Sequence, residues 1–174
     1  MSRAPTPDDE TARLAELQAY DVLDTPPEQQ YDDLVDLAAH ICEAPIALIS
    51  LIDEKRQWFK ARYGLETRET DRDVAFCAHA ILQPDTFVVE DALGDERFAD
   101  NPLVTAEPKI RFYAGAPLVN AEGHALGTLC VIDRVPRKLS PDQEKSLRIL
   151  SRHVMGQLEL RRRTLEMRKL RLQN

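Results

Sequence analysis

Near both ends of the chain, apolar residues recur every three or four positions, which is the spacing of one face of a helix. Leu14 and Leu17 predict a first helix over residues 7–20, and a second is expected over residues 27–42. A third helix is expected to begin at Pro141. Its apolar positions are Leu147, Leu150, Val154 and Leu158.

The same start signal, a Ser or Thr followed by Pro, precedes each predicted helix, at Thr6, Thr25 and Ser140. Such a hydroxyl can accept a hydrogen bond from a free backbone N–H of the first turn. Proline costs no hydrogen bond at that position. Glu28 and Gln143 would complete capping boxes. The second helix is expected to bury one stripe, consisting of Tyr31, Leu34, Leu37, Ala38 and Ile41.

Between these helices the pattern changes to short runs rich in β-branched and aromatic residues. Residues 45–53 and 56–63 predict two strands with a short polar connection, and therefore a hairpin. Residues 112–119 and 125–132 predict a second hairpin. The remaining expectations are a strand over 86–90, a short helix over 74–82 and an irregular stretch over 91–111.

The order of these elements predicts an α+β domain. Strands that follow one another through tight turns favour an antiparallel sheet. Helices gathered at both chain ends are expected to cover one face of that sheet. This order does not fit a doubly wound parallel fold, in which helices alternate with strands.

The composition is that of a folded protein. The chain has 174 residues, of which 43% are hydrophobic and 30% charged, and these values exclude a disordered or low-complexity chain. The net charge is −7, but residues 161–174 hold six basic side chains against one acidic side chain. The acidic remainder argues against nucleic-acid binding. We therefore expect one domain over residues 1–160, followed by a basic extension over 161–174.

Nothing in the hydropathy pattern predicts a membrane segment or a secretory leader. The longest uncharged apolar run near the middle, residues 44–52, is much shorter than the roughly 20 residues that a membrane span needs. The first residues lack an apolar stretch. The three cysteines, Cys42, Cys77 and Cys130, are widely spaced and odd in number. They are expected to be reduced thiols of a cytoplasmic protein.

Six segments, taken in order, resemble a GAF domain: residues 23–28, 45–53, 56–60, 76–81, 111–117 and 127–133. More narrowly, they are similar to the GAF sensor modules at the N-terminus of bacterial sensor histidine kinases and diguanylate cyclases. The resemblance covers about residues 10–160. It implies a PAS-related antiparallel sheet of five or six strands, with the N- and C-terminal helices on one face and a crossover segment on the other. It also implies a small-molecule pocket or its remnant, output through the C-terminal helix, and usually a dimer.

A pocket between the sheet and the crossover, residues 74–111, would be lined by aromatic, thiol and imidazole side chains. The candidates are Trp58, Phe76, Cys77, His79, Phe98, Phe112, Tyr113 and Cys130. Aromatic rings with polar tips suit both ligand contact and core packing. No catalytic residue is assigned. No metal site is assigned either, because residues two apart on a helix, such as Cys77 and His79, point away from each other.

One enzyme alternative comes from the same resemblance, free methionine-(R)-sulfoxide reductase, which uses redox cysteines that must meet in space. Here the thiols lie on separate segments, and Cys130 is expected to be inert inside an apolar strand. Bilin-binding GAF domains are also a poor match in the order Cys77-Ala78-His79. Of the pattern that cyclic-nucleotide-binding GAF domains carry, Asn101, Lys109 and Phe112 are present, but no Asp-Glu pair follows at the matching distance. The cofactor, if there is one, is therefore unknown.

The last helix carries a heptad spacing of leucines at Leu158, Leu165 and Leu172, with Arg161 and Arg168 between them. This half-polar seam predicts a weak coiled coil in a homodimer.

Taken together, these patterns predict a cytoplasmic, non-enzymatic sensor module of signal transduction, such as a two-component system. It would bind an unidentified small ligand and signal through its last helix to an output domain or a partner signalling protein. A ligand-free dimerisation scaffold is the third reading.

Overall fold

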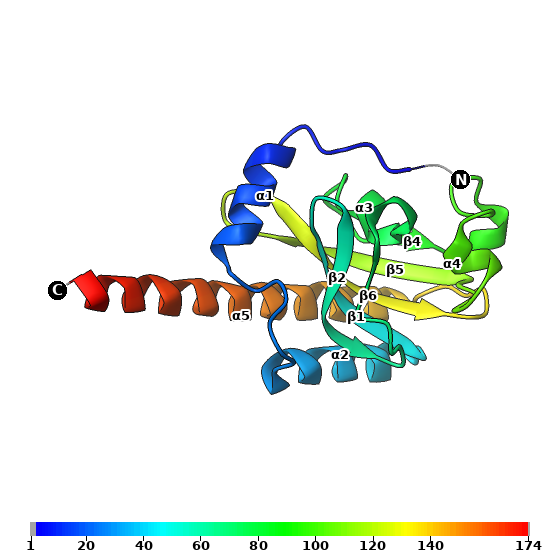
Figure 1. The fold of residues 1–174 in the computed structure, drawn as a ribbon. Coiled ribbons are helices and arrows are strands. Elements are labelled where there is room, and N and C mark those ends of the chain that lie inside the picture. Colours follow the sequence, from blue (N-terminus) through cyan, green and yellow to red (C-terminus); the bar gives the residue numbers. More distant parts are fainter. Residues whose placement is uncertain (1–2, 174) are drawn as a thin grey trace.

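The computed structural model describes residues 3–173, which form one six-stranded sheet with helices on both faces (Figure 1). The helices are α1 Glu10–Ala19, α2 Gln29–Cys42, α3 Phe76–Ala80, α4 Pro102–Thr105 and α5 Pro141–Gln173, with 3₁₀ turns η1 Arg72–Val74 and η2 Ala92–Gly94. The strands are β1 Ile46–Ile52, β2 Arg56–Tyr63, β3 Glu69–Asp71, β4 Phe87–Val89, β5 Phe112–Val119 and β6 Ala125–Asp133.

All neighbouring strands of the sheet are antiparallel, in the order β3-β2-β1-β6-β5-β4. The predicted hairpins 45–63 and 112–132 are both present. Between them β1 pairs with β6, which brings the two hairpins into one sheet. The α+β fold predicted from the sequence is confirmed, with six strands.

Side chains that alternate along the central strands build two separate cores. On β6, Leu129 and Val131 belong to the core that α1, α2 and α5 cover. Cys130 and Ile132 belong to the opposite core, which the segment from η1 to α4 covers. We call these the helix side and the crossover side of the sheet.

The sequence missed strand β3. Its three residues, Glu69, Thr70 and Asp71, are polar and pair only with β2 at the edge of the sheet. So short and polar a strand has no hydrophobic alternation from which it could be recognised. The predicted strand 86–90 is shortened to Phe87–Val89.

Of the three predicted helix caps, only that of Ser140 is correct. Its hydroxyl accepts from the Gln143 N–H at 3.1 Å, and the Gln143 side chain accepts from the Ser140 N–H at 3.0 Å. Helix α1 begins three residues later than Thr6-Pro7 predicts. Helix α2 begins after Glu28, with no side-chain cap. Thr25 lies outside the helix, four residues before its first residue Gln29, and its hydroxyl donates to the Val22 carbonyl and accepts from Lys60.

The buried stripe of α2 also differs from the prediction. Leu37 and Ile41 are 48% and 37% exposed. The buried positions are Tyr31, Val35, Ala38, Ala39 and Cys42. Tyr31 and Ala38 are thus buried as predicted, whereas packing on α5 and on the sheet buries Val35, Ala39 and Cys42 and leaves Leu37 and Ile41 exposed.

Helix α5 follows the prediction along its first half. Leu147, Leu150, Val154 and Leu158 are buried against the sheet and α2. The helix then continues as one unbroken rod past the rest of the fold (Figure 1). Along residues 3–173, no helix combines the length and the apolar character needed to cross a membrane.

Candidate functional site

The sheet divides the eight predicted pocket residues between its two sides. Six lie on or beside the crossover side: Phe76, Cys77, His79, Phe98, Tyr113 and Cys130. The other two, Trp58 and Phe112, belong to the core on the helix side, so their assignment to this pocket was wrong.

The alternation of the strands explains both errors. Phe112 and Tyr113 are neighbours on β5, so only one of them can face the crossover, and this is Tyr113. On β2, Trp58 and Phe59 are also neighbours, and it is Phe59 that faces the crossover. Since both members of each pair are large and apolar, hydrophobic periodicity alone could not choose between them.

A small cavity of 90 Å³ lies on the crossover side of the sheet. Its walls come from β1, β2, β5 and β6 below and from α3 and the 103–110 stretch above. Most of the lining is apolar: Ile46, Leu48, Phe59, Leu65, Phe76, Leu103, Ile110, Tyr113 and Ile132 contribute, with Cys77 and Cys130. Four polar residues also line it, Gln57, Thr67, Thr70 and Glu107. Sequence reasoning missed Ile46 and Leu48, although their spacing of two on β1 was a usable signal.

Stacked aromatic rings hold α3 over the cavity. The ring centroids of Phe76 and Phe98 are 4.1 Å apart and nearly parallel. Phe76 also lies 5.3 Å from Tyr113 on the sheet, and His79 meets Phe98 edge-on at 4.8 Å. Helix α3 is therefore packed on the sheet through aromatic contacts, whereas β4 joins the crossover to the sheet by backbone pairing with β5.

Two cysteines meet beside the cavity, which the sequence did not predict. The Sγ atoms of Cys77 on α3 and Cys130 on β6 are 4.0 Å apart. The Cys77 sulfur is also 3.0 Å from the Tyr113 hydroxyl and 3.0 Å from the Thr128 hydroxyl. All four residues are buried. Cys130, expected to be inert in its strand, thus faces a second thiol.

The two thiols have different acidities. Burial opposes ionisation of Cys77, but hydrogen bonds with Cys130, Ser50, Thr128 and Tyr113 outweigh it and lower the pKa of Cys77 to about 7. Burial raises the pKa of Cys130 well above its usual value, and the contact with Cys77 adds to this. Cys77 is therefore the sulfur that ionises first.

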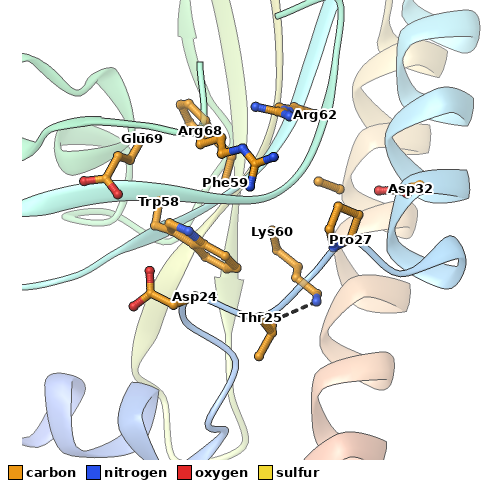
Figure 2. Close-up of a pocket in the computed structure, with 11 residues that line it drawn as sticks. Asp24, Thr25, Pro27, Asp32, Trp58, Phe59, Lys60, Arg62, Arg68 and Glu69 are labelled. Carbon is orange, nitrogen blue, oxygen red and sulfur yellow. Dashed lines mark hydrogen bonds between the residues drawn. The ribbon is translucent and has the colours of Figure 1, made fainter. Parts of the chain in front are cut away.

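A second hollow, of 320 Å³, lies between β2 and the segment that enters α2 (Figure 2). Trp58 forms part of its wall. Three acidic residues, Asp24, Asp32 and Glu69, and three basic ones, Lys60, Arg62 and Arg68, line it. Since the two signs are mixed, the hollow selects neither an anion nor a cation.

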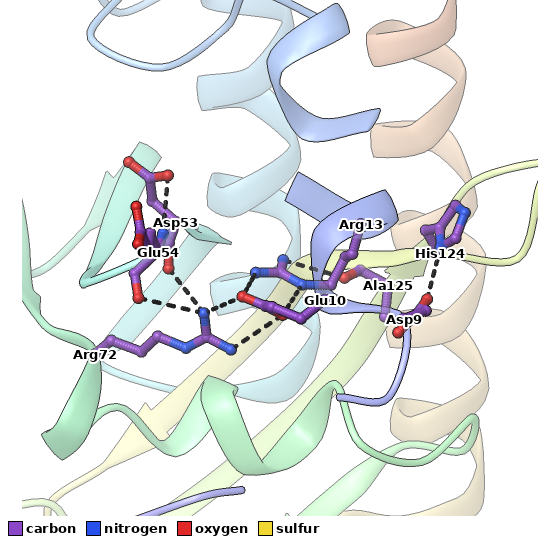
Figure 3. Close-up of polar contacts among 8 residues, drawn as sticks. All are labelled: Asp9, Glu10, Arg13, Asp53, Glu54, Arg72, His124 and Ala125. Atoms are coloured by element: carbon purple, nitrogen blue, oxygen red, sulfur yellow. Dashed lines mark hydrogen bonds and ion pairs between the residues drawn. The ribbon is translucent and has the colours of Figure 1, made fainter. Parts of the chain in front are cut away.

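Ion pairs join the crossover to α1 (Figure 3). The Glu10 carboxylate accepts from Arg13 Nε at 2.8 Å and from Arg72 Nη1 at 2.5 Å. Arg72, in η1, also donates to the Asp53 carbonyl at 3.1 Å. At the start of α1, Asp9 lies 2.6 Å from the Nδ1 atom of His124. The N-terminal helix is thus joined directly to η1 and to the second hairpin, and through Arg72 to the first hairpin.

Helix α1 is fastened in turn to α5. Arg162 forms an ion pair with Glu16 at 2.6 Å. Arg161 donates to the Tyr20 carbonyl at 2.9 Å, and the Tyr20 hydroxyl donates to Glu159. These contacts lie where α5 leaves the fold, so α1 connects the crossover with the exposed part of α5.

Within residues 3–173 there is no group of three or more His, Cys, Asp or Glu side chains placed to hold a metal ion. Cys42 is buried in the core of the helix side, whereas Cys77 lies on the crossover side.

Sequence comparison supports this architecture. The family model described as GAF domain matches residues 26–158. A cyclic di-GMP phosphodiesterase of Pseudomonas aeruginosa is 45% identical over 167 residues. That alignment covers 94% of this chain but only 28% of the relative. The chain therefore spans less than a third of the length of this curated relative.

Solved structures with the same fold come from several kinds of protein. The GAF domain of an Acinetobacter phosphoenolpyruvate-protein phosphotransferase has a TM-score of 0.62 at 21% identity, covering 91% of this chain and 95% of that one. The corresponding domain from Coxiella burnetii has a TM-score of 0.63 at 15% identity, covering 88% of this chain and 95% of that one. A type II free methionine-R-sulfoxide reductase from Thermoplasma acidophilum has a TM-score of 0.60 at 14% identity, covering 74% of this chain and 89% of that one. At these identities the likeness shows the fold alone.

Proposed function

Because the chain belongs to the GAF domain family, we propose that it is a cytoplasmic sensory module without catalytic activity of its own. A small molecule held on the crossover side of the sheet would change the position of α5 on the helix side. Helix α5 would pass that change to an output domain or to a partner signalling protein.

The observation that carries this proposal is the position of β6 between the cavity and α5. Cys130 lines the cavity, while its neighbours Leu129 and Val131 point into the core that α5 covers. Because a packed core transmits small displacements rather than absorbing them, a ligand that shifts β6 shifts the packing of α5. The ligand must bind the protein more tightly when α5 is in one position than when it is in the other, since occupancy alone does not shift the equilibrium between the two positions.

The size of the cavity limits the ligand. Pockets for drug-sized molecules measure about 300–1,000 Å³, and this cavity measures 90 Å³. In this conformation it accepts a ligand of a few non-hydrogen atoms, and neither a nucleotide nor a bilin fits. Its mostly apolar wall favours a small, weakly polar molecule, with Gln57 and Thr70 as hydrogen-bonding partners.

The relative from Pseudomonas aeruginosa suggests the output. It is named a cyclic di-GMP phosphodiesterase, and its alignment with this chain covers 28% of its length. We infer that this module regulates an enzyme of cyclic di-GMP turnover, in the same chain or in a partner. A role in a two-component system stays a prediction.

A homodimer through the terminal helices is part of the proposal, with a different seam from the one expected. Leu158 is 1% exposed and serves the core of its own protomer. The exposed apolar residues of α5 are Leu160, Met167, Leu170 and Leu172. A parallel pair of α5 helices would bury the first three of these.

Native mass spectrometry of freshly purified protein tests the ligand. We expect extra mass that leaves on unfolding, together with slower hydrogen exchange in α3 and in residues 155–165 when the ligand is bound. A Leu103→Trp substitution should fill the cavity and abolish both effects. Leu93→Trp is the matched control, because Leu93 is 52% exposed and lies outside the cavity lining.

Two results would count against the sensor. Protein of unliganded mass, with no stabilisation by a panel of small apolar and amino-acid-like compounds, would favour the dimerisation scaffold. Ligand binding that protects α3 but leaves α5 exchange unchanged would contradict the proposed route of the signal.

One observation supports the reductase alternative, namely the 4.0 Å separation of the Cys77 and Cys130 sulfurs. Turnover of free methionine sulfoxide with a thiol reductant, lost in Cys77→Ser and retained in Cys42→Ser, would establish it. Absence of turnover by folded protein would leave the non-enzymatic module.

A further inference from the structure

The thiol pair is a chemical site in its own right. We propose that Cys77 and Cys130 form an oxidation site, at which a small hydroperoxide converts the two thiols into a disulfide inside the folded protein. This inference goes beyond the proposed function because it needs no ligand and no output domain.

The geometry places the two reacting sulfurs together. They are 4.0 Å apart, on α3 and on β6, and these elements pack against each other. A disulfide needs a sulfur separation of about 2 Å, so an approach of about 2 Å closes the bond. Cys42 lies in the core on the other side of the sheet and cannot take part.

The surroundings favour Cys77 as the attacking sulfur. Tyr113 and Thr128 each place a hydroxyl 3.0 Å from it, and both hydroxyls can donate to a thiolate. Burial raises the pKa of Tyr113 well above its usual value, so its hydroxyl keeps the proton that it donates. Both cysteines line the 90 Å³ cavity, which has room for a molecule little larger than water, such as hydrogen peroxide.

The chemistry proceeds in two balanced steps. The Cys77 thiolate attacks one oxygen of hydrogen peroxide; an S–O bond forms, the O–O bond breaks, and hydroxide leaves and is protonated to water. The Cys130 thiol then attacks the Cys77 sulfenic acid; the S–S bond forms, the S–O bond breaks, and the departing hydroxide takes the Cys130 proton. Two thiols and one peroxide give one disulfide and two waters.

Oxidation would also change the sensor. Closing the disulfide draws α3 toward β6 and so reshapes the cavity wall that both sulfurs form. A cellular thiol reductant would restore the open form.

Peptide mapping tests the proposal on the full chain. Reduced protein is treated with hydrogen peroxide, unfolded in N-ethylmaleimide and digested with trypsin, which can cleave between the two cysteines at Arg97, Lys109 and Arg111. We expect a disulfide-linked Cys77–Cys130 peptide and an alkylated Cys42. Alkylation of all three cysteines after peroxide treatment of folded protein, or a disulfide that includes Cys42, would overturn the proposal.

Variants separate the two steps. Cys130→Ser should stop at a Cys77 sulfenic acid, which dimedone traps when the oxidised protein is unfolded in its presence because Cys77 is buried in the folded protein. Cys42→Ser should form the disulfide as the unmodified chain does. A Cys130→Ser protein that is folded, as its thermal unfolding shows, and yields no dimedone adduct on Cys77 would contradict the assigned attacking role.

The hydrogen-bond donors have a test of their own. Tyr113→Phe should raise the pKa of Cys77 and so move the pH profile of the oxidation rate to higher pH. Below that pKa, the rate at a given pH should fall about tenfold for each unit by which the pKa rises. Tyr63→Phe is the matched control, because Tyr63 is 45% exposed and lies on another strand. Identical pH profiles for Tyr113→Phe and the unmodified chain would remove Tyr113 from the site.

Discussion

Glu10 Oε1 lies 2.5 Å from Arg72 Nη1, and this ion pair joins the first helix to the segment that covers the cavity. Both side chains are largely buried, at 17% and 13% exposure. Burial opposes ionisation of Glu10, but hydrogen bonds from Arg13 and Arg72 outweigh it and lower the pKa of Glu10 from 4.5 to about 2. Glu10 therefore stabilises the fold in its charged form.

Replacing Glu10 by Gln should lower the free energy of unfolding by about 1–2 kcal/mol at neutral pH. Because the pKa is lower in the folded state, the stabilisation is complete above the unfolded pKa of about 4.5 and is lost as the pH falls toward 2. Urea unfolding at several pH values should therefore show that the free energies of unfolding of the unmodified chain and of Glu10→Gln converge as the pH falls from 5 to 2. Glu144→Gln, at a surface pair, is the control and should change stability by less than about 0.5 kcal/mol. A Glu10→Gln effect that does not depend on pH would contradict this account.

Lys60 is a buried cation that lies 5.1 Å from the ring centroid of Tyr31, and its hydrogen-bond and ion-pair partners come from the loop before α2. Its Nζ atom donates to Thr25 Oγ1 and to the Pro26 carbonyl, both at 2.8 Å, and lies 2.6 Å from Glu28. Lys60→Met keeps the apolar stem but leaves these acceptors without a donor, so we expect a loss of about 2–4 kcal/mol. Equilibrium unfolding measures it. The exposed Lys55→Met should be nearly neutral, and equal stabilities for the two variants would refute the role of Lys60.

Two glycines offer opposite predictions for the same substitution. A Cβ atom on Gly127 would lie 1.8 Å from the Ser50 carbonyl oxygen on the neighbouring strand, whereas one on Gly156 meets nothing within 4 Å. Gly127→Ala should destabilise the sheet by more than about 3 kcal/mol or prevent folding. Gly156→Ala, inside α5, should stabilise the folded protein by roughly 0.5–1 kcal/mol. Thermal unfolding compares them, and a tolerated Gly127→Ala would mean that β1 and β6 are farther apart than described.

The exposed stripe of α5 allows the proposed dimer to be tested apart from the fold. Met167→Glu should shift the dimer to monomer while each monomer keeps its fold, since Met167 is 56% exposed. Leu158→Ala should instead cost about 2–5 kcal/mol of stability, because Leu158 is buried. Sedimentation velocity gives the oligomeric state. A dimer that persists in Met167→Glu would place the interface elsewhere.

Local patterns in the sequence were enough to find most elements. The strands of both hairpins and the start of α5 could be predicted because alternation, helical spacing and the Ser140 capping box are properties of adjacent residues. Local patterns predicted the caps at Thr6 and Thr25 wrongly, since a hydroxyl can also form hydrogen bonds with residues far along the chain. Lys60, 35 residues from Thr25, occupies that hydroxyl in the structure.

The face chosen by an ambiguous strand depended on its neighbours. Trp58 and Phe59 are both apolar, and a bulge where β1 passes from Ile49 to Ser50 shifts the pairing with β2. Only the paired sheet decides that Phe59 faces the cavity and Trp58 the helices.

By itself, then, the sequence determined the order of the longer helices and strands, the antiparallel hairpins and the GAF resemblance, because these depend on residues close together in the chain. The tertiary structure alone decided that Cys77 and Cys130, 53 residues apart, meet at 4.0 Å, and that Leu158 belongs to the core rather than to a dimer seam. The physical reason is that contacts between distant segments follow from how whole elements pack, and side-chain spacing within one element does not encode them.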